Sequence, residues 1–130
     1  MKLTAEAVQE KGGFTGRPVK REITWKDETY DVYVRRLSYR SAVDDARAYG
    51  QGASAIAAHR IANCIVDENG EPIFSVEHIT GVDEHGDPVM IEDEKGNKVE
   101  RGAMDDDLAT ALMLVISEVN SLGKRKATAA

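Results

Sequence analysis

The chain has a single cysteine, Cys64, among its 130 residues. One thiol excludes an intramolecular disulfide and fits a reducing cytoplasm. The sequence also lacks any apolar run of about 18 residues, so no membrane-spanning helix is predicted. Residues 1–6 lack the apolar centre of a secretory signal, so secretion is not expected. These absences favour a small protein that is neither secreted nor anchored by a membrane-spanning helix.

Motifs that carry catalysis or bind cofactors are also missing. No Cys-x-x-Cys or His-x-x-x-His spacing occurs, and His59 and Cys64 would lie about 140° apart on a helix. The glycine-rich segment 12–17 lacks the Gly-Lys-Ser/Thr ending of a phosphate-binding loop, which favours a flexible linker. We therefore predict no catalytic residues, no cofactor and no metal, and an enzyme is the least favoured class.

Three acidic turn motifs recur as Asp-Glu-x-Gly, at residues 67–70, 83–86 and 93–96. A calcium loop of the EF-hand type needs Gly at its sixth position, where the first two segments have Pro72 and Pro88. Asp and Gly in this order are typical of tight turns. Turn formation is therefore the preferred interpretation of all three segments.

Charge is distributed unevenly along the chain, whose net charge is −6. Residues 1–62 contain 11 Lys/Arg and 8 Asp/Glu, whereas residues 63–123 contain 3 and 15. The acidic half should repel nucleic acid and anionic membranes, and it could attract a basic protein partner. The simpler interpretation is a solvated acidic surface that aids solubility.

A basic and aromatic cluster follows the second predicted strand. It consists of Arg35, Arg36 and Arg40 with Tyr33 and Tyr39. Such a cluster could stack on nucleic acid. The alternative is a solvated edge whose arginines pair with Asp44 and Asp45, and the pI of about 5.1 favours it. Neither nucleic acid nor membrane is therefore expected as a partner.

The N-terminal third is predicted to form a β-hairpin. Apolar residues alternate with polar ones in segments 19–25 and 29–36, on either side of a short polar turn at residues 26–28. Before it, Thr4 can cap a short helix, and glycines at positions 12, 13 and 16 form a link. A second, exposed acidic hairpin is expected where residues 89–91 face Val99.

Helices are predicted around this hairpin from their caps and apolar stripes. The expected segments are a helix that starts at Ser38 or Ser41 and ends near Tyr49, a helix at 54–65, one turn at 75–79 and a long helix at 105–122. The first two are Ala-rich and should pack as an antiparallel pair. In the long helix, a stripe of Leu108, Leu112, Val115, Ile116, Val119 and Leu122 should be buried.

The fold class predicted from these elements is α+β, with an N-terminal β-hairpin, a mainly helical body and a second, exposed acidic hairpin. We expect one domain over residues 1–130. Within it, residues 1–13 form a helical arm, 14–123 the core and 124–130 a flexible tail.

Met113 and Leu114 lie off the main stripe of the long helix, on a side that also carries Ser117. Exposed apolar side chains on a largely polar face can mark a partner-binding site. Alternatively, the N-terminal helix or the hairpin covers them. These three residues are the candidate partner-binding site.

Several segments resemble the phage tail assembly chaperone family of long-tailed phages. They are Gly-Arg-Pro-Val-Lys-Arg-Glu-Ile-Thr-Trp at 16–25, the arginine-containing segment 33–39, the end of the Ala-rich helix with the turn after it at 64–77, and the closing segment 118–124. The resemblance covers roughly residues 14–80 and 105–124. Residues 81–104 depart from it, because they insert an acidic hairpin between two helices that are usually closer.

The resemblance implies a chaperone that binds the tape measure protein, brings tail tube subunits to it, acts in the host cytoplasm and is absent from the mature virion. A ribosomal frameshift often gives a longer form that contacts the tail tube protein, and this chain would be the short form. The family supplies no catalytic residues. The alternative is a structural virion subunit, such as a tail tube or connector protein, which should consist mostly of strands.

Overall fold

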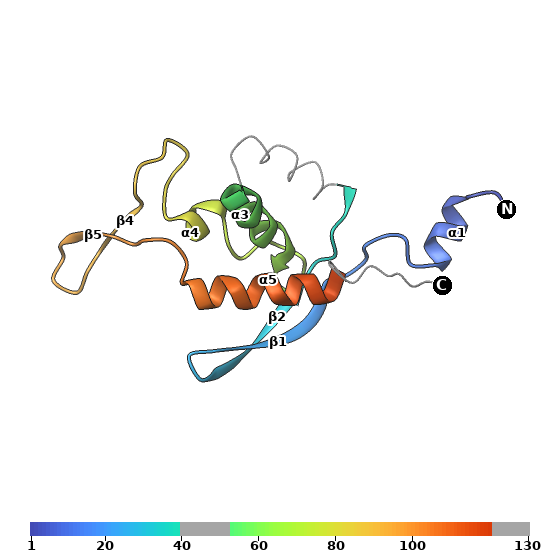
Figure 1. Cartoon of the computed structure of the whole chain (residues 1–130), viewed down its shortest axis with the longest axis horizontal. Helices are drawn as coiled ribbons and strands as arrows, with labels where there is room; N and C mark the ends of the chain where they lie inside the picture. The colour runs from blue at the N-terminus through green and yellow to red at the C-terminus, as the bar shows by residue number, and fades with distance from the viewer. Residues whose placement is uncertain (40–52, 121–130) are drawn as a thin grey trace.

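The computed structural model describes residues 1–39 and 53–120. In this part of the chain the fold is mixed α+β, with four helices and two small antiparallel sheets, which confirms the predicted class (Figure 1). The helix predicted to end near Tyr49 and the tail at 124–130 lie outside the described residues. The elements in chain order are α1 (Ala5–Glu10), β1 (Val19–Trp25), β2 (Glu28–Val34), α3 (Ala53–Cys64), β3 (Ile65–Val66), α4 (Val76–Thr80), β4 (Met90–Glu92), β5 (Lys98–Glu100) and α5 (Asp106–Asn120).

β1 and β2 form an antiparallel pair in a register that runs from Val19 opposite Val34 to Trp25 opposite Glu28. The connecting turn contains two residues, Lys26 and Asp27, both with positive φ (51° and 63°). The predicted three-residue turn at 26–28 is therefore wrong, because Glu28 already pairs in the sheet. A two-residue turn of this hand matches the natural twist of the two strands.

β2 is the central strand, because β3 pairs with its other edge, with Val34 opposite Ile65. α3 runs directly into β3, so the end of this helix is fixed to the sheet. α5 packs against β1, β2 and α3, and Figure 1 shows it between the β1–β2 hairpin and α3. This arrangement makes α5 the element that joins the sheet to the helical part.

The core lies where α5 meets the sheet and α3. Its buried members are Ile23, Val32, Val34, Ile61, Cys64, Ile65, Leu112, Val115 and Ile116. Within the predicted stripe of α5, Leu108 and Val119 are partly buried against this core. Cys64 is fully buried, as expected for a small apolar residue on the Ala/Ile stripe. The core is small, which makes each buried side chain count heavily in stability.

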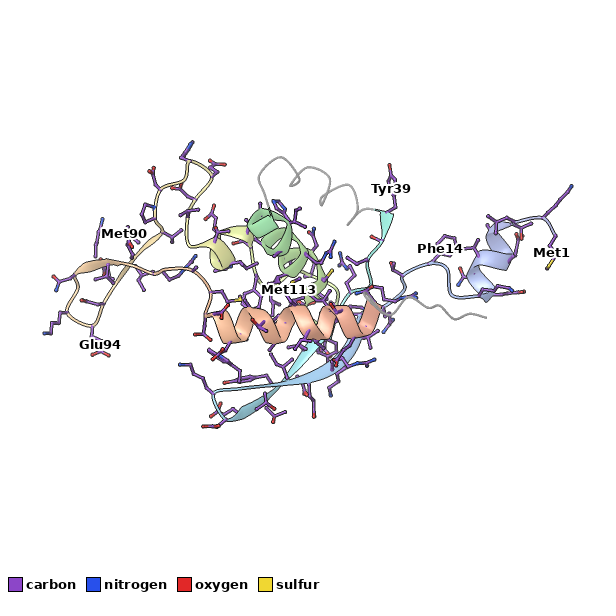
Figure 2. The ribbon with its side chains drawn as sticks, viewed as in Figure 1. Met1, Phe14, Tyr39, Met90, Glu94 and Met113 are labelled. Atoms are coloured by element: carbon purple, nitrogen blue, oxygen red, sulfur yellow. The ribbon has the colours of Figure 1, made fainter. Side chains whose placement is uncertain are left out.

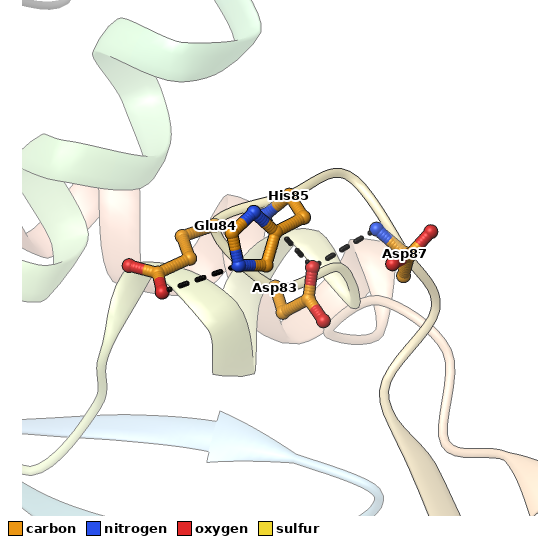
Figure 3. A network of polar contacts seen from close by, with 4 residues as sticks. All are labelled: Asp83, Glu84, His85 and Asp87. Atoms are coloured by element: carbon orange, nitrogen blue, oxygen red, sulfur yellow. Dashed lines mark hydrogen bonds and ion pairs between the residues drawn. The ribbon is translucent and has the colours of Figure 1, made fainter.

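The loop at residues 83–87 explains the recurring acidic turn motif (Figure 3). Asp83 Oδ1 accepts hydrogen bonds from the backbone N–H groups of His85 (2.9 Å) and Asp87 (3.0 Å). Gly86 has φ of 82°, and its N–H donates to the Asp83 carbonyl oxygen at 3.0 Å. The aspartate closes the loop and the glycine supplies the left-handed residue.

The loops that begin at Asp67 and Asp93 repeat this geometry. In each, Oδ1 of the aspartate accepts from the N–H groups two and four residues further on, at 2.8–3.0 Å. Gly70 and Gly96 again have positive φ and donate to the aspartate carbonyl oxygen at 3.0 Å. Turn chemistry thus accounts for every Asp and Gly that first suggested calcium loops.

The segment 81–104 projects from the body as a hairpin, and its base is held close to α4 (Figure 1). Gly81 ends α4 with φ of 80°, and its N–H donates to the Glu77 carbonyl oxygen at 2.9 Å. On the returning chain, the Met104 N–H donates to the Ile79 carbonyl oxygen at 3.0 Å. A Cβ on Gly81 would lie 2.6 Å from the carbonyl carbon of Gly102, so the two chain segments touch through backbone. The base of the hairpin is therefore fixed, while all residues of β4 and β5 are exposed.

Candidate functional site

An open groove of about 550 Å³ runs between α3 and α5, with the end of α4 at one side. Its lining is mostly apolar and small. The lining residues are Ala57, Ala58, Ile61, Ile79, Thr80, Ala103, Asp106, Ala109, Thr110, Met113, Leu114 and Ser117. Its volume falls within the range of ligand pockets in proteins.

Alanines on the facing sides of the two helices explain why the groove exists. Ala57 and Ala58 of α3 and Ala109 of α5 fill little space beyond Cβ, so a trough is left where larger side chains would interdigitate. Deeper down, Ile61 is buried and closes the floor. From the sequence alone, the alanines of α3 predict only a face for close helix packing. The same pattern is the signal for the groove.

The three predicted partner-binding residues all line this groove. Leu114 is 60% exposed, whereas Met113 is partly buried and packs against the core. The expectation that Met113 points away from the buried face is therefore wrong. α5 is covered by the sheet on one side and α3 on the other, so its apolar face is wider than a single stripe. Figure 2 shows Met113 on the side of α5 toward α3.

α1 does not cover these residues. No residue of α1 is buried, and Figure 1 shows the helix at the far end of the molecule from the β4–β5 hairpin. Thr4 caps it as predicted, with its hydroxyl oxygen accepting from the Ala7 N–H at 3.0 Å. The β1–β2 hairpin lies against α5 on the side opposite α3. Neither α1 nor the β1–β2 hairpin, the two elements predicted to cover these residues, lies in the groove.

At the end of the groove marked by Asp106, three aspartates lie at the start of α5: Asp105 precedes the helix, and Asp106 and Asp107 are in its first turn. Asp105 caps the helix, since its Oδ2 accepts from the Leu108 N–H at 3.2 Å. The same oxygen accepts from the Trp25 indole N–H at 3.0 Å, a link between residues 80 positions apart. These donors, the indole first and the helix N–H second, hold the pKa of Asp105 below its ordinary value of 3.8. The tip of the hairpin is thereby tied to the start of α5.

Because the pKa of Asp105 is lowered on folding, its ionised form stabilises the native state above pH 3.8, and this contribution is lost as pH falls through the lowered value. We expect Trp25→Phe to destabilise the protein at neutral pH and to flatten the acid limb of its stability curve. Urea unfolding between about pH 5 and pH 2 measures this. Parallel curves for the two proteins would show that the indole does not set the titration.

The arginines after β2 bind backbone carbonyl groups. The Arg36 guanidinium donates to the carbonyl oxygens of Gly12 (3.3 Å), Phe14 and Thr15 (3.2 Å), and Arg35 donates to that of Gly70. Stacking on nucleic acid and pairing with acidic side chains are the two roles that the sequence suggests for this cluster, and neither predicts these hydrogen bonds to backbone carbonyl groups. Arg40 and the predicted acidic partners at 44 and 45 lie outside the described residues. Arg35 and Arg36 fasten the N-terminal arm and the first Asp loop to the end of β2.

Within residues 1–39 and 53–120, no three His, Cys, Asp or Glu side chains gather as a metal site requires. None of the helices in the same part of the chain has the length and apolarity needed to cross a membrane. The described structure thus offers an apolar groove with an acidic end, a combination suited to binding a protein segment.

The described structure is a small α+β fold with an open, mostly apolar groove between α3 and α5. Residues 6–120 match the family model described as "Phage tail assembly chaperone, TAC". The chain therefore belongs to the phage tail assembly chaperone family, as its sequence segments suggested. Neither a curated protein nor a solved structure matches it significantly.

Proposed function

We propose that this protein binds the tape measure protein of its phage and promotes assembly of the tail tube, and that the groove between α3 and α5 holds apolar segments of that client. The observation that carries the proposal is the family match over residues 6–120. The family description names an assembly role, which requires no catalytic group, cofactor or metal in this chain.

The groove supplies the physical means. It exposes apolar surface of α5 beside small residues of α3, so an apolar side chain of a client can enter without displacing the core. A chaperone that binds such a segment removes it from water and lowers the free concentration of the aggregating form. The acidic surface keeps the complex dispersed through repulsion between like charges.

The remaining parts of the proposal follow from the family role. The protein works in the host cytoplasm and is absent from the finished virion. The tail tube protein is a second partner, through a frameshifted longer form. We also propose that the chain acts as one domain in which residues 1–13 are an arm; residues 124–130 lie outside the described residues.

Substitution in the groove tests the client-binding site. We expect Leu114→Glu to weaken binding of the tape measure protein at least about tenfold, or 1.4 kcal/mol, because it places a charge where an apolar contact forms. Leu114 is 60% exposed and glutamate favours helices, so folding should be retained. Co-expression, co-purification and titration of the purified proteins measure the loss.

Ile73→Glu is the matched control, since Ile73 is 46% exposed and does not line the groove. It should bind the client as the unmodified protein does. Failure of the unmodified protein to co-purify with the tape measure protein, or to keep it in solution, would overturn the function. If the unmodified protein, Leu114→Glu and Ile73→Glu all bind the client equally, the groove is not the client-binding site.

A further inference from the structure

The inserted segment 81–104 forms one end of the groove. Ala103, at the end of the insert, lines it together with Ile79 and Thr80 of α4. The contact between Gly81 and Gly102 and the hydrogen bond from Met104 to Ile79 fix this end. Ala103 is the residue of the insert that lines the groove, and these backbone contacts hold the base of the insert in position beside it.

The insert carries apolar side chains that are exposed and do not pack in the core. Met90 is 48% exposed, and Ile91 and Val99, which face each other across the two strands, are 45% and 39% exposed. Figure 2 shows Met90 and Glu94 on the part of the hairpin that projects from the body. A two-stranded hairpin gains little stability in water. Exposed apolar pairs on a positioned hairpin favour a contact with another molecule.

The negative charge of the insert and of the adjoining end of the groove indicates which kind of partner would bind there. The insert contains seven Asp/Glu and three Lys/Arg, and Asp106 adds a carboxylate inside the groove. The groove lining includes no basic residue. In the described part of the chain, Glu94, Glu100 and Asp106 form no ion pair. A partner segment that carries Lys or Arg at this end would gain attraction without breaking an existing pair.

We propose that the groove takes an amphipathic helix whose basic end lies over Asp106 and the insert, so that residues 81–104 select clients by a Lys/Arg cluster beside an apolar stripe. The groove runs along α5 from Asp106 to Ser117, which are eleven positions or about 16 Å apart, and this length matches three turns of helix. Apolar residues of the client at i, i+3 or i+4, and i+7 would face the alanines. This inference rests on the proposed function, since the client is the tape measure protein.

Charge reversal on the insert is the test. We expect the double substitution Glu94→Lys and Glu100→Lys to weaken binding of basic-ended client peptides at least tenfold. The matched control is Glu6→Lys with Glu10→Lys on α1, which changes the net charge equally; no residue of α1 lines the groove, and α1 lies at the far end of the molecule from the β4–β5 hairpin (Figure 1). The control should change affinity less than twofold.

The probes are overlapping 25-residue peptides that cover the tape measure protein, each titrated against the full chain by fluorescence anisotropy at low and at physiological salt. The strongest binders should be amphipathic helices with Lys or Arg at one end, and their affinity should fall with salt. Moving the Lys/Arg cluster to the other end of the best peptide should abolish the effect of the insert reversal.

Equal losses from the insert and α1 reversals would show that net charge alone attracts the client, and would overturn the inference. The inference would also be overturned if the peptides that bind most strongly carry no basic residues. It would be overturned again if the protein forms dimers that Leu114→Glu dissociates and that no peptide displaces, because the groove would then be occupied by a second copy of the chain. If no tape measure peptide binds the unmodified protein, the proposed function fails. If peptides bind and the insert reversal has no effect, only the inference fails.

Discussion

Replacing Ile116 with alanine should lower the free energy of unfolding by about 2–5 kcal/mol. The Ile116 side chain is fully buried on α5, where the core shared with the sheet and α3 lies. Alanine leaves a cavity that the surrounding helices and strands cannot close without moving. Because a small domain is stabilised by only about 5–15 kcal/mol, the loss is a large fraction of the total. Urea unfolding followed by circular dichroism measures it.

Leu114→Ala is the comparison for this substitution, two residues away on the same helix. Its side chain is 60% exposed, so stability should change by less than about 0.5 kcal/mol. A similar loss for both variants would mean that α5 does not pack as described. With the expected difference, the Leu114 variant can be used for binding studies without concern for folding.

Gly81→Ala should destabilise the protein by about 2–5 kcal/mol, because two costs combine. Gly81 has φ of 80°, which an L-residue adopts with strain, and a Cβ there would lie 2.6 Å from the Gly102 carbonyl carbon and 2.7 Å from the Ala103 nitrogen. Both contacts are to backbone, so no side-chain rotation relieves them. We also expect the insert to move away from α4, which thermal unfolding and hydrogen exchange at Met104 would reveal.

Gly96→Ala separates the two costs. Gly96 has nearly the same φ, 81°, but nothing lies within 4 Å of the added Cβ. Only the left-handed conformation is penalised there, by about 1–2 kcal/mol, and the effect should remain local to the hairpin. If Gly81→Ala and Gly96→Ala lower the free energy of unfolding equally, the close backbone approach at Gly81 contributes nothing to the cost of the substitution.

The features that the sequence predicted well depend on neighbours within a few residues. The Asp83 loop closes within five residues, and the α4 cap at Ser75 accepts from the His78 N–H three positions on. Side-chain type and spacing determine such structures almost alone. The α5 stripe is a similar case, because a period of 3.6 residues already selects Leu112 and Ile116 for the interior.

Contacts between distant residues could not be predicted in the same way. The Trp25 indole reaches Asp105, and the Leu37 N–H donates to the Asn120 side chain at 2.7 Å, across 80 and 83 positions. Nothing in local spacing distinguishes these partners from other polar residues. The groove has the same origin, since Ala57 and Met113 become neighbours only when α3 packs beside α5.

The Asp loops have a consequence for where the chain can be lengthened. Residues 66–72 and 82–88 share the order Val-Asp-Glu-x-Gly-x-Pro, and in each the valine pairs with the proline. In both units the aspartate accepts from N–H groups of its own loop. Val66 of the first unit is buried and pairs with Tyr33, whereas Val82 of the second is 37% exposed, so only the second unit depends little on the core. Lengthening the chain at this second unit would therefore leave the packing of the core unchanged.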